Sequence, residues 1–456
     1  MQVLERVFGL GSAGTTVRRE LAAGLATFFT LSYILFVQPA ILGAAGMDPG
    51  GVLFATCVAS ALACFAMAGL ANYPFALAPA MGHNVFFAFT VCAGLGFRWQ
   101  EALAANLLAG GIFLALSGVG FREWVMNAIP DGLKYAIGAG IGLLIALVGL
   151  EWAGLVVDHP VLLVQLGDLG RPETLLALFG LAATSVLLVR KVPGAVLLGV
   201  LATAAAGWLA TAALDLDPAL VRVEGLAGRP PSPEATAFQL DFAGLFARPW
   251  TDWLTVLLVF LVLDLFDTVG TLVGVADRAG FLVDGRLPRA RGALAADAAG
   301  TVTGALLGTS TVTTYVESAA GVASGGRTGL TAVVVGLCML GALFFAPLIQ
   351  AVGAGVDVGA GDAPELRYPV IAPVLVLVGV LMMGAVRRID WEDLVEAIPA
   401  FLTLVVMQLS VSITDGIAWG FLSYSLLSAV SGRLRTTSPA VHLFALLFLL
   451  RYLFLT

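Results

Sequence analysis

The chain consists mostly of long apolar runs separated by short polar segments. Of its 456 residues, 59% are hydrophobic and only 12% are charged, which is about half the charged fraction of a soluble protein. A run of about 20 apolar residues is long enough to cross the hydrocarbon layer of a bilayer as a helix. The pattern therefore predicts an all-α protein with many membrane spans. It predicts no separate soluble domain, because the longest polar stretch covers only about 214–248.

Hydropathy over a window of about 19 residues places the spans. The expected spans are 20–44, 52–70, 75–95, 101–119, 133–150, 173–189, 193–213, 252–275, 293–307, 310–324, 328–350 and 368–386. The region 395–430 is apolar but interrupted at Ser412–Gly416. Counted as one broken span, and followed by a last run at 438–455, it gives fourteen spans. If 395–411 and 415–431 cross separately, 438–455 is a fifteenth span or an interfacial helix. The first run lacks a signal-peptide cleavage pattern, so we expect it to stay uncleaved.

Three carboxylates stand out inside these apolar spans. Asp264 and Asp267 are three residues apart, so both fall on one face of a helix. A charged side chain near the bilayer centre costs roughly 2.5–3.5 kcal/mol on insertion scales. Such residues are kept where they face a polar interior, form pairs or bind protons. Glu317 lies in an equally apolar stretch that is rich in Gly, Ser and Thr. The three residues predict a transporter that moves a polar solute together with protons or sodium.

Basic residues indicate which span ends face the cytoplasm, because short loops on that side are rich in Lys and Arg. They gather before the first span and after an even number of spans, in clusters formed by Arg6, Arg18, Arg19, Arg122, Lys134, Arg190, Lys191, Arg278, Arg286, Arg289, Arg291, Arg327, Arg387 and Arg388. The loops 151–172, 214–251 and 351–367 are richer in Asp, Glu and Pro. We therefore expect the N-terminus in the cytoplasm and these three loops outside.

The polar linker 214–250 divides the chain into two repeats, 1–213 and 251–456. Each repeat has about seven spans. An odd number of spans makes the two repeats insert with opposite orientations. That arrangement is typical of secondary transporters built from inverted repeats.

The third span of each repeat is irregular. The first, 75–95, contains Pro79 and Gly82, and the second, 310–324, begins with a run of polar β-branched residues. Irregular backbone is tolerated in a membrane only where it is buried in protein or lines a cavity. Interrupted spans at matching positions of two repeats therefore indicate a binding site.

Four motifs follow one another along the chain: Ala78–Thr90, Asp264–Gly274, Leu307–Gly329 and Ser412–Ile417. Together they resemble the motifs of the AzgA-like purine permeases in the nucleobase–ascorbate transporter superfamily. The resemblance covers nearly the whole chain, with Ala80 and His83 as departures from the usual Gly and apolar residue. It implies fourteen spans in two inverted repeats. Spans 1–4 and 8–11 would form a core domain, and spans 5–7 and 12–14 a gate domain. Short strands in spans 3 and 10 would meet at mid-membrane.

The resemblance also implies roles for the three carboxylates. It makes Glu317 a substrate ligand, because a purine presents N–H groups that a buried carboxylate accepts in strong hydrogen bonds. The alternative is a structural carboxylate that caps a half-helix. Asp264 matches an acidic position that faces the substrate from span 8. Asp267 shares its helix face and would relay protons or bond within the core. We assign proton coupling to Asp264, Asp267 and Glu317, because burial helps a carboxylate to take up a proton.

Polar and aromatic residues beside the interruptions complete the predicted substrate site. Asn84 offers a donor and an acceptor to the edge of a base, or else satisfies broken backbone. Tyr315 lies two residues before Glu317, so in an extended segment both point to one side. Phe86 and Phe266 are candidates to stack on a flat base, where stacking contributes roughly 1–3 kcal/mol. In a chain with 27 Phe, ordinary packing is the competing explanation for either ring.

Two more polar residues have weaker signals. Asp415 lies in the C-terminal interruption and is expected near a gate, with a helix N-cap as the alternative. His83 is a candidate proton carrier or a hydrogen-bonded structural residue. No residues have the spacing of a metal site, and no phosphate-binding loop for ATP is present. We expect no cofactor, with H⁺ as the coupling ion and Na⁺ as the alternative.

Other cargoes and other classes of protein remain as alternatives. A transporter of the same fold would carry uracil, xanthine or an inorganic anion, as the SulP-type transporters do. An anion fits poorly, because the three carboxylates would repel it and spans 3, 8 and 10 contain no Lys or Arg. An ion channel would not need binding residues from interrupted spans in both halves. A membrane enzyme is disfavoured, since no nucleophile or metal cluster is recognisable.

The leading hypothesis is a proton-coupled importer of hypoxanthine, guanine or adenine. The outward-facing core would bind a proton and a purine, close once its charge is neutralised, and move against the gate domain to open inward. The expected partners are a purine nucleobase and the lipid bilayer, without nucleic acid. The resemblance further implies a homodimer through the gate domain, and by analogy we expect the inner membrane of a bacterium.

Overall fold

The structure is a computed structural model that describes residues 2–116, 129–161, 163–223, 225–282, 287–359, 365–434 and 436–454. Arg122 and Arg286, which the orientation argument uses, lie outside this part, as do the side chains of Phe266 and Arg278. The described chain is mostly helical, so the predicted fold class is confirmed.

Each half consists mainly of helices, with a few short strands between them. The first half contains α1 (Gln2–Phe8), α2 (Val17–Leu31), α3 (Ile34–Gly43), α4 (Pro49–Leu70), β1 (Leu77–Pro79), α5 (Met81–Val85), the π-helix η1 (Phe86–Gly94), α6 (Trp99–Leu116), α8 (Asp131–Trp152), β2 (Val156–His159), β3 (Leu163–Leu166), α9 (Pro172–Val189) and α10 (Ala195–Leu214). The second half contains α11 (Phe242–Ala247), α12 (Trp250–Arg278), α13 (Ala290–Leu307), β4 (Val312–Thr314), α14 (Ser318–Ala323), α15 (Gly329–Ala342), η2 (Leu343–Phe345), α16 (Ala346–Gly353), β5 (Val356–Asp357), β6 (Leu366–Arg367), α17 (Ala372–Met382), η3 (Met383–Arg388), α18 (Leu394–Leu409), α19 (Ile413–Val430) and α20 (Pro439–Phe454).

Side-chain caps determine where several helices begin. Asp48 accepts a hydrogen bond from the backbone N–H of Gly51 at 2.6 Å, and Pro49 occupies the first position of α4. Thr16 and Thr328 cap α2 and α15 in the same way. Gly308 ends α13 with a φ of +96°, in the left-handed region that glycine tolerates, and the chain then leads into β4.

Seven described segments are long and apolar enough to cross a membrane. They are Val17–Gly43, Pro49–Leu70, Trp99–Leu116, Asp131–Trp152, Pro172–Val189, Ala195–Leu214 and Gly329–Gly353. Each coincides with a predicted span. The total of fourteen spans stays a prediction, because the other candidates are interrupted, shorter or less apolar.

The C-terminal region differs from the favoured interpretation of one broken span over 395–430. Two separate helices, α18 and α19, occupy it and pack against each other. Val411 has a φ of +49° in the short connection, where the chain turns back. The helix α20 then packs against α19. The alternative prediction, with two segments in this region, therefore describes the helices better.

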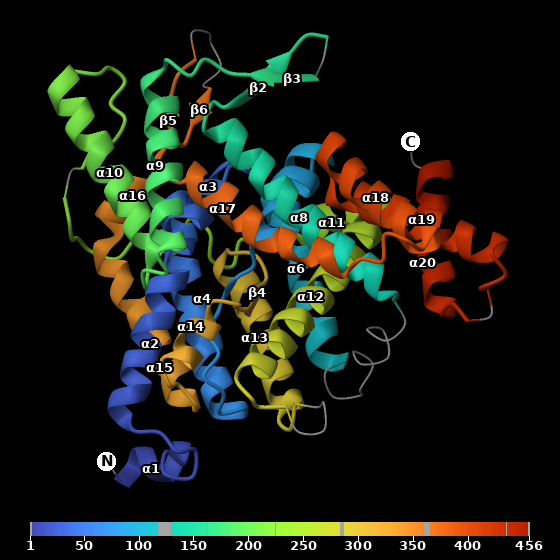
Figure 1. Ribbon diagram of the computed structural model, residues 1–456, viewed down its shortest axis with the longest axis horizontal. Coiled ribbons are helices and arrows are strands. Elements are labelled where there is room, and N and C mark those ends of the chain that lie inside the picture. The colour runs from blue at the N-terminus through green and yellow to red at the C-terminus, as the bar shows by residue number, and fades with distance from the viewer. Residues whose placement is uncertain are drawn as a thin grey trace.

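Two groups of helices pack mainly among themselves. One contains α2, α4, α6, α13 and α15; of these, α2, α4 and α15 lie in the lower left of Figure 1, with α13 and α6 to their right. The other contains α8, α9, α17, α18 and α19, which cross the upper part of the same view. The long helix α12 contacts members of both groups, α6 on one side and α8 on the other.

Strands β1 and β4 interrupt the third span of each half and pair with each other in antiparallel fashion. The register places Leu77 opposite Thr314, and Pro79 opposite Val312. Every residue of both strands is buried. A short helix follows each strand, α5 after β1 and α14 after β4. The prediction of short strands in the two interrupted spans is confirmed.

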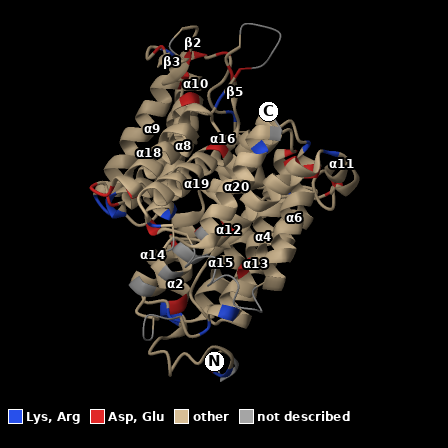
Figure 2. Ribbon diagram, turned by 90° about the vertical axis from the view of Figure 1, so that its right-hand side faces the viewer, with Lys and Arg blue, Asp and Glu red and all other residues tan. Residues whose placement is uncertain are grey.

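Charged side chains gather at helix ends and in connecting segments, while the helices themselves are largely free of them (Figure 2). The polar linker is attached through such charges. Arg248 donates to Glu101 at 2.7 Å and to the carbonyl of Leu95 at 3.4 Å. These bonds join the linker to the end of η1 and to the first turn of α6.

Candidate functional site

The two strand–helix junctions bring polar side chains from both halves of the chain to one place. Asn84 lies in α5, which follows β1, while Tyr315 and Glu317 follow β4. The helix α12 contacts both β4 and α5, and it carries Asp264 and Asp267. The structure therefore brings together elements that the sequence places more than one span apart.

The short helices α5 and α14 begin at this junction. They contain only five and six residues, and neither has a side-chain cap. The first N–H groups of a helix lack partners within it and carry a partial positive charge. In α14, however, the N–H groups of Ser318, Ala319 and Ala320 donate to the carbonyls of the three residues Tyr315–Glu317. The π-helix η1 continues directly from α5. π-Helical segments are rare in proteins, but those that occur are often found at functional sites.

Glu317 is half-buried at the start of α14. Its Oε1 accepts a hydrogen bond from the hydroxyl of Tyr33 at 2.8 Å. Tyr33 lies at the bend between α2 and α3 and is itself buried. Sequence reasoning missed Tyr33. The one available signal is a phenol inside the first apolar span.

Asp267 faces an open space, because 39% of its side chain is exposed. Its Oδ2 lies 3.9 Å from Nδ1 of His83, which is only 1% exposed. At that distance the two groups form an ion pair when the imidazole carries a proton. Asp267 also lies close enough to Glu317 for the two carboxylates to interact electrostatically. The predicted sharing of one site by acidic residues from spans 8 and 10 is visible in this arrangement.

Asp264 lies deeper than Asp267, with 2% exposed. Its Oδ1 is 3.4 Å from the hydroxyl of Thr268. The same hydroxyl is 2.6 Å from Oδ2 of Asp297, a fully buried carboxylate on α13. Asp297 also accepts from the hydroxyl of Thr313 at 2.9 Å and from the backbone N–H of Thr314 at 3.0 Å.

Sequence reasoning missed Asp297, although its signal matched that of Asp264. Both are carboxylates inside a predicted span, but Asp264 has Asp267 beside it on the same helix face. Asp297 lies in an Ala-rich run with no motif around it, so attention to the motifs passed over it. Its contacts make it the link between α13, α12 and β4.

Asn84 is fully buried, and both ends of its amide have partners within the protein. Its Nδ2 donates to Oε1 of Gln38, and its Oδ1 accepts from the hydroxyl of Ser310. Gln38 in turn donates to Thr309 at 2.8 Å and to Ser310 at 3.3 Å. This ring of side chains joins α3 and α5 to the segment before β4. In this conformation the amide satisfies the interrupted region, which is the alternative that the sequence left open.

The predicted aromatic contacts are used for packing here. Tyr315 is 6% exposed, and its hydroxyl donates to the carbonyl of Pro79 at the end of β1. Phe86 is fully buried and lies edge-on to Phe260 with ring centroids 4.9 Å apart. The side chain of Phe266 lies outside the described part of the structure.

Asp415 joins the last two helices. Its Oδ1 accepts from the hydroxyl of Tyr452 at 2.7 Å and from Arg451 at 3.2 Å, both on α20. The N-cap of α19 is Ser412, so the alternative interpretation of Asp415 as the cap is wrong. The predicted gating role of Asp415 remains a prediction.

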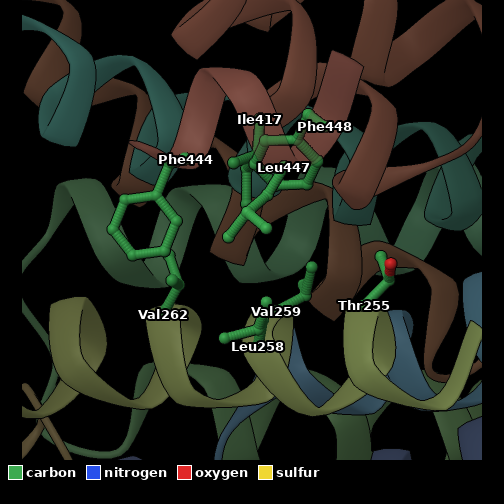
Figure 3. Close-up of a pocket in the computed structure, with 8 residues that line it drawn as sticks. All are labelled: Thr255, Leu258, Val259, Val262, Ile417, Phe444, Leu447 and Phe448. Carbon is green, nitrogen blue, oxygen red and sulfur yellow. The ribbon is translucent and has the colours of Figure 1, made fainter. Parts of the chain in front are cut away.

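An apolar pocket lies between α12 and the two helices α19 and α20 (Figure 3). Its lining consists of Thr255, Leu258, Val259, Val262, Ile417, Phe444, Leu447 and Phe448. None of these side chains is charged, so the pocket is distinct from the polar strand junction. Thr255 is the one polar side chain among the residues that line this pocket between α12, α19 and α20.

The sequence model of the Permease family matches residues 18–419. The chain is 45% identical over 457 residues to the putative permease MJ0326 of Methanocaldococcus jannaschii, covering 100% of this chain and 99% of the relative. It is 42% identical to the adenine permease AdeP of Escherichia coli (strain K12), covering 99% and 96%. It is 40% identical to the guanine/hypoxanthine permease PbuG of Bacillus subtilis (strain 168), covering 99% and 100%.

A solved structure is similar in fold. The transmembrane domain of a cyanobacterial bicarbonate transporter, BicA, superimposes with a TM-score of 0.63. The match covers 88% of this chain and 97% of that domain, with 17% sequence identity. At this identity the likeness concerns the fold alone, and it agrees with the predicted transporter fold.

Proposed function

The chain belongs to the Permease family, and from that membership we propose that it imports purine nucleobases together with protons. The family and the relatives make it a membrane transporter of nucleobases rather than an enzyme. One observation carries the finer proposal. Asp267 and Glu317, from opposite halves of the chain, interact beside the paired strands β1 and β4.

A purine presents ring N–H donors and ring-nitrogen or carbonyl acceptors, so its site needs both kinds of partner. Glu317 supplies the acceptor, and the Tyr33 hydroxyl orients this carboxylate by donating a hydrogen bond to it. In this proposal, backbone N–H groups at the start of α5 supply the donors. Hypoxanthine, guanine and adenine all match this pattern. Asn84 acts in this proposal as part of the frame, because its amide already bonds to Gln38 and Ser310.

Proton coupling follows from the cost of closing negative charge into a low-dielectric interior. Ionised carboxylates at the junction make closure unfavourable, and proton uptake on the acidic group removes that cost. Asp264, Asp267 and Glu317 form the proton-binding group in this proposal. In this proposal the proton reaches Asp267 first, because Asp267 is more exposed than Asp264.

The two groups of helices support a movement of core against gate. The core would comprise α2–α6 and α11–α16, and the gate would comprise α8–α10 and α17–α20. The proposed membrane orientation and the homodimer through the gate are those predicted from the sequence. The pocket in Figure 3 lies between these bodies, and its apolar lining has few polar contacts to break when α12 moves. The proposed location is a bacterial inner membrane, with the N-terminus in the cytoplasm.

Radiolabelled uptake in transport-deficient cells tests the proposal. Hypoxanthine, guanine and adenine are supplied in mildly acidic and mildly alkaline medium, with and without a protonophore. The wild type is compared with Glu317→Gln, which keeps the size of the side chain and its bond from Tyr33. We expect saturable uptake of at least one purine, loss with the protonophore, and loss in the variant.

Each arm of this experiment addresses one part of the proposal. Well-expressed protein without purine uptake would refute the cargo. Purine uptake that persists with the protonophore but requires sodium would replace H⁺ by Na⁺. Unchanged uptake by Glu317→Gln would remove Glu317 from the substrate site.

A further inference from the structure

We propose that Phe89 and Trp152 form an outer closure of the substrate site, a ring contact that holds the core against the gate while the site is open toward the cytoplasm. The inference rests on the proposed movement of core against gate and on the predicted membrane orientation. It concerns two aromatic residues to which the proposed function gives no role. The contacts that carry it join α8 of the gate to α5 and η1 of the core.

The first of these contacts lies at the start of α5. Gly82 is the second residue of α5, and α5 packs against the gate helix α8. A Cβ atom on Gly82 would lie only 2.9 Å from Cγ2 of Ile141 on α8. Glycine therefore lets the gate approach the core closely at this point, directly after strand β1.

The second contact lies farther along the same two segments. The rings of Phe89 on η1 and Trp152 at the end of α8 meet at an angle of 65°, with centroids 6.3 Å apart. Edge-to-face ring pairs at about this separation attract each other. Ile141 and Trp152 lie about three turns apart on one face of α8. The gate therefore contacts this segment of the core at two points roughly 16 Å apart along α8.

Each ring of the pair is held by its own body. The Trp152 ring lies 4.3 Å from that of Tyr368, and the Tyr368 N–H donates to the Trp152 carbonyl at 2.9 Å. Tyr368 leads into α17, which packs along α8 within the gate. Phe89 stays with the core, because η1 continues from α5 and its end accepts from Arg248 of the linker. A relative movement therefore breaks the Phe89–Trp152 contact and leaves the Trp152–Tyr368 contact intact.

These contacts lie on the side of the paired strands that the sequence predicts to be outside. The end of η1 bonds to the polar linker, and Trp152 lies at the start of the loop 151–172. Both the linker and this loop are predicted to be outside. In Figure 2, β2 and β3, which follow Trp152, lie at the opposite end of the molecule from the N-terminus.

The other side of the paired strands is open. The side chain of Asp267 is 39% exposed, and Val316 is 52% exposed. Val316 lies between β4 and α14, and α14 lies in the lower half of Figure 2, on the side of the N-terminus. Asp267 lies in the second half of α12, which ends at Arg278. The site is therefore covered by α8 on its outer side and is accessible from the cytoplasmic side.

A single ring pair has a suitable strength for such a closure. Uptake requires the site to open outward, so the contact has to break and form again in every cycle. An aromatic pair shifts an equilibrium between two states by roughly two- to tenfold. That effect favours the inward-open state and still allows the core to move.

Thiol labelling of the site tests the inference. A Val316→Cys reporter is introduced into a chain without the four native cysteines. A membrane-impermeant maleimide is applied to intact cells and, separately, to inside-out vesicles. We expect slow labelling in cells and fast labelling in vesicles. Labelling from neither side, or faster labelling in cells, would overturn the inference.

Trp152→Ala in the reporter chain should speed the labelling in intact cells by roughly two- to tenfold, because it removes one ring of the pair. Trp208→Ala is the matched control. Trp208 belongs to α10 of the same gate and is 51% exposed, so its loss should leave the labelling rate unchanged. No acceleration by Trp152→Ala, or an equal acceleration by the control, would overturn the inference.

Phe89→Leu covers the case in which Trp152→Ala fails to fold. It keeps an apolar side chain and removes the other ring, so it should also speed the labelling in cells. An unchanged rate for this variant would overturn the inference. The labelling needs no purine, so a wild type without purine uptake would refute the proposed cargo and leave the closure intact. Unchanged labelling of the variants together with normal purine uptake would refute the closure alone.

Discussion

The hydroxyl of Tyr33 donates a hydrogen bond of 2.8 Å to Oε1 of Glu317, although 284 residues separate the two along the chain. The bond joins the bend of the first span to the start of α14. It fixes the direction of the carboxylate that we propose for purine binding. We therefore predict that Tyr33 affects purine affinity, although no motif indicates it.

Replacing Tyr33 by Phe should weaken purine binding without unfolding the protein. A hydrogen bond to a charged group contributes roughly 1.5–3 kcal/mol, which corresponds to at least a tenfold rise in KM. Initial uptake rates over a range of purine concentrations measure it. Tyr73→Phe is the control, because Tyr73 is equally buried and its hydroxyl contacts the backbone of Arg289 instead. Equal KM values for the two variants would contradict the assignment.

Asn84→Ala should lower stability more than it changes specificity. The substitution leaves Gln38 and Ser310 without their amide partner, and each buried unsatisfied group costs about 1–3 kcal/mol. Thermal unfolding of the purified protein in detergent measures the loss. Gln38→Ala breaks the same ring and should match it in melting temperature and in KM. A KM that rises tenfold more for Asn84→Ala would restore the direct purine contact predicted from the sequence.

Cross-linking α12 to α20 should stop transport. Val262 and Phe444 line the same apolar pocket from opposite helices, so cysteines at both positions are within reach of a short, cleavable bifunctional thiol reagent. In a background without the four native cysteines, we expect uptake to fall to background and to return after reduction. The control pair, Ile417→Cys with Phe448→Cys, lies within the proposed gate and should keep its uptake. Full uptake by the cross-linked first pair would refute the relative movement.

The pair of Asp393 and Arg433 should give a pH-dependent contribution to stability. Arg433 donates to Asp393, which also caps α18 by accepting from the Val395 N–H at 3.1 Å. The hydrogen bond from the Arg433 guanidinium holds the pKa of Asp393 below its ordinary value of 3.8. The pair therefore contributes to the free energy of unfolding at pH values above the ordinary pKa of Asp393. This contribution is lost as the pH falls through the lowered pKa.

Arg433→Gln should accordingly melt at a lower temperature than the wild type at neutral pH, with a difference that vanishes in strongly acidic buffer. Arg388→Gln is the control, since Arg388 lies over the ring of Tyr135 at 5.6 Å and its effect should not depend on acid. A difference for Arg433→Gln that grows on acidification would contradict the assigned sign.

Sequence patterns predicted the features that depend on local chemistry. Pro79, Gly82 and the β-branched run before Glu317 mark interrupted spans, because together these residues disfavour a regular helix. The strands β1 and β4 and the helices after them lie where those residues predict. Asp267 and Glu317 were recognisable because a carboxylate in an apolar span is costly and is usually kept for a function.

Contacts between distant segments could not be predicted in the same way. The partners of Asn84 are Gln38 and Ser310, and the partners of Asp415 are on the last helix, so local sequence does not reveal them. Asp297 was overlooked because it had no motif, although its burial and its donors equal those of any motif residue. The turn at Val411 could not be predicted, because valine gives no sequence signal for the positive φ that it adopts here.

The pairing of β1 with β4 has a consequence for how the protein is made. The strand β1 leaves the ribosome long before its partner, since Pro79 and Tyr315, which bond across the pair, are 236 residues apart. Until the tenth span arrives, the extended segment has backbone groups that lipid cannot satisfy. The first half is therefore an incomplete product that must be shielded during insertion. A truncated chain would contain β1 without its partner β4, and the exposed edge of this strand would mark the chain as defective.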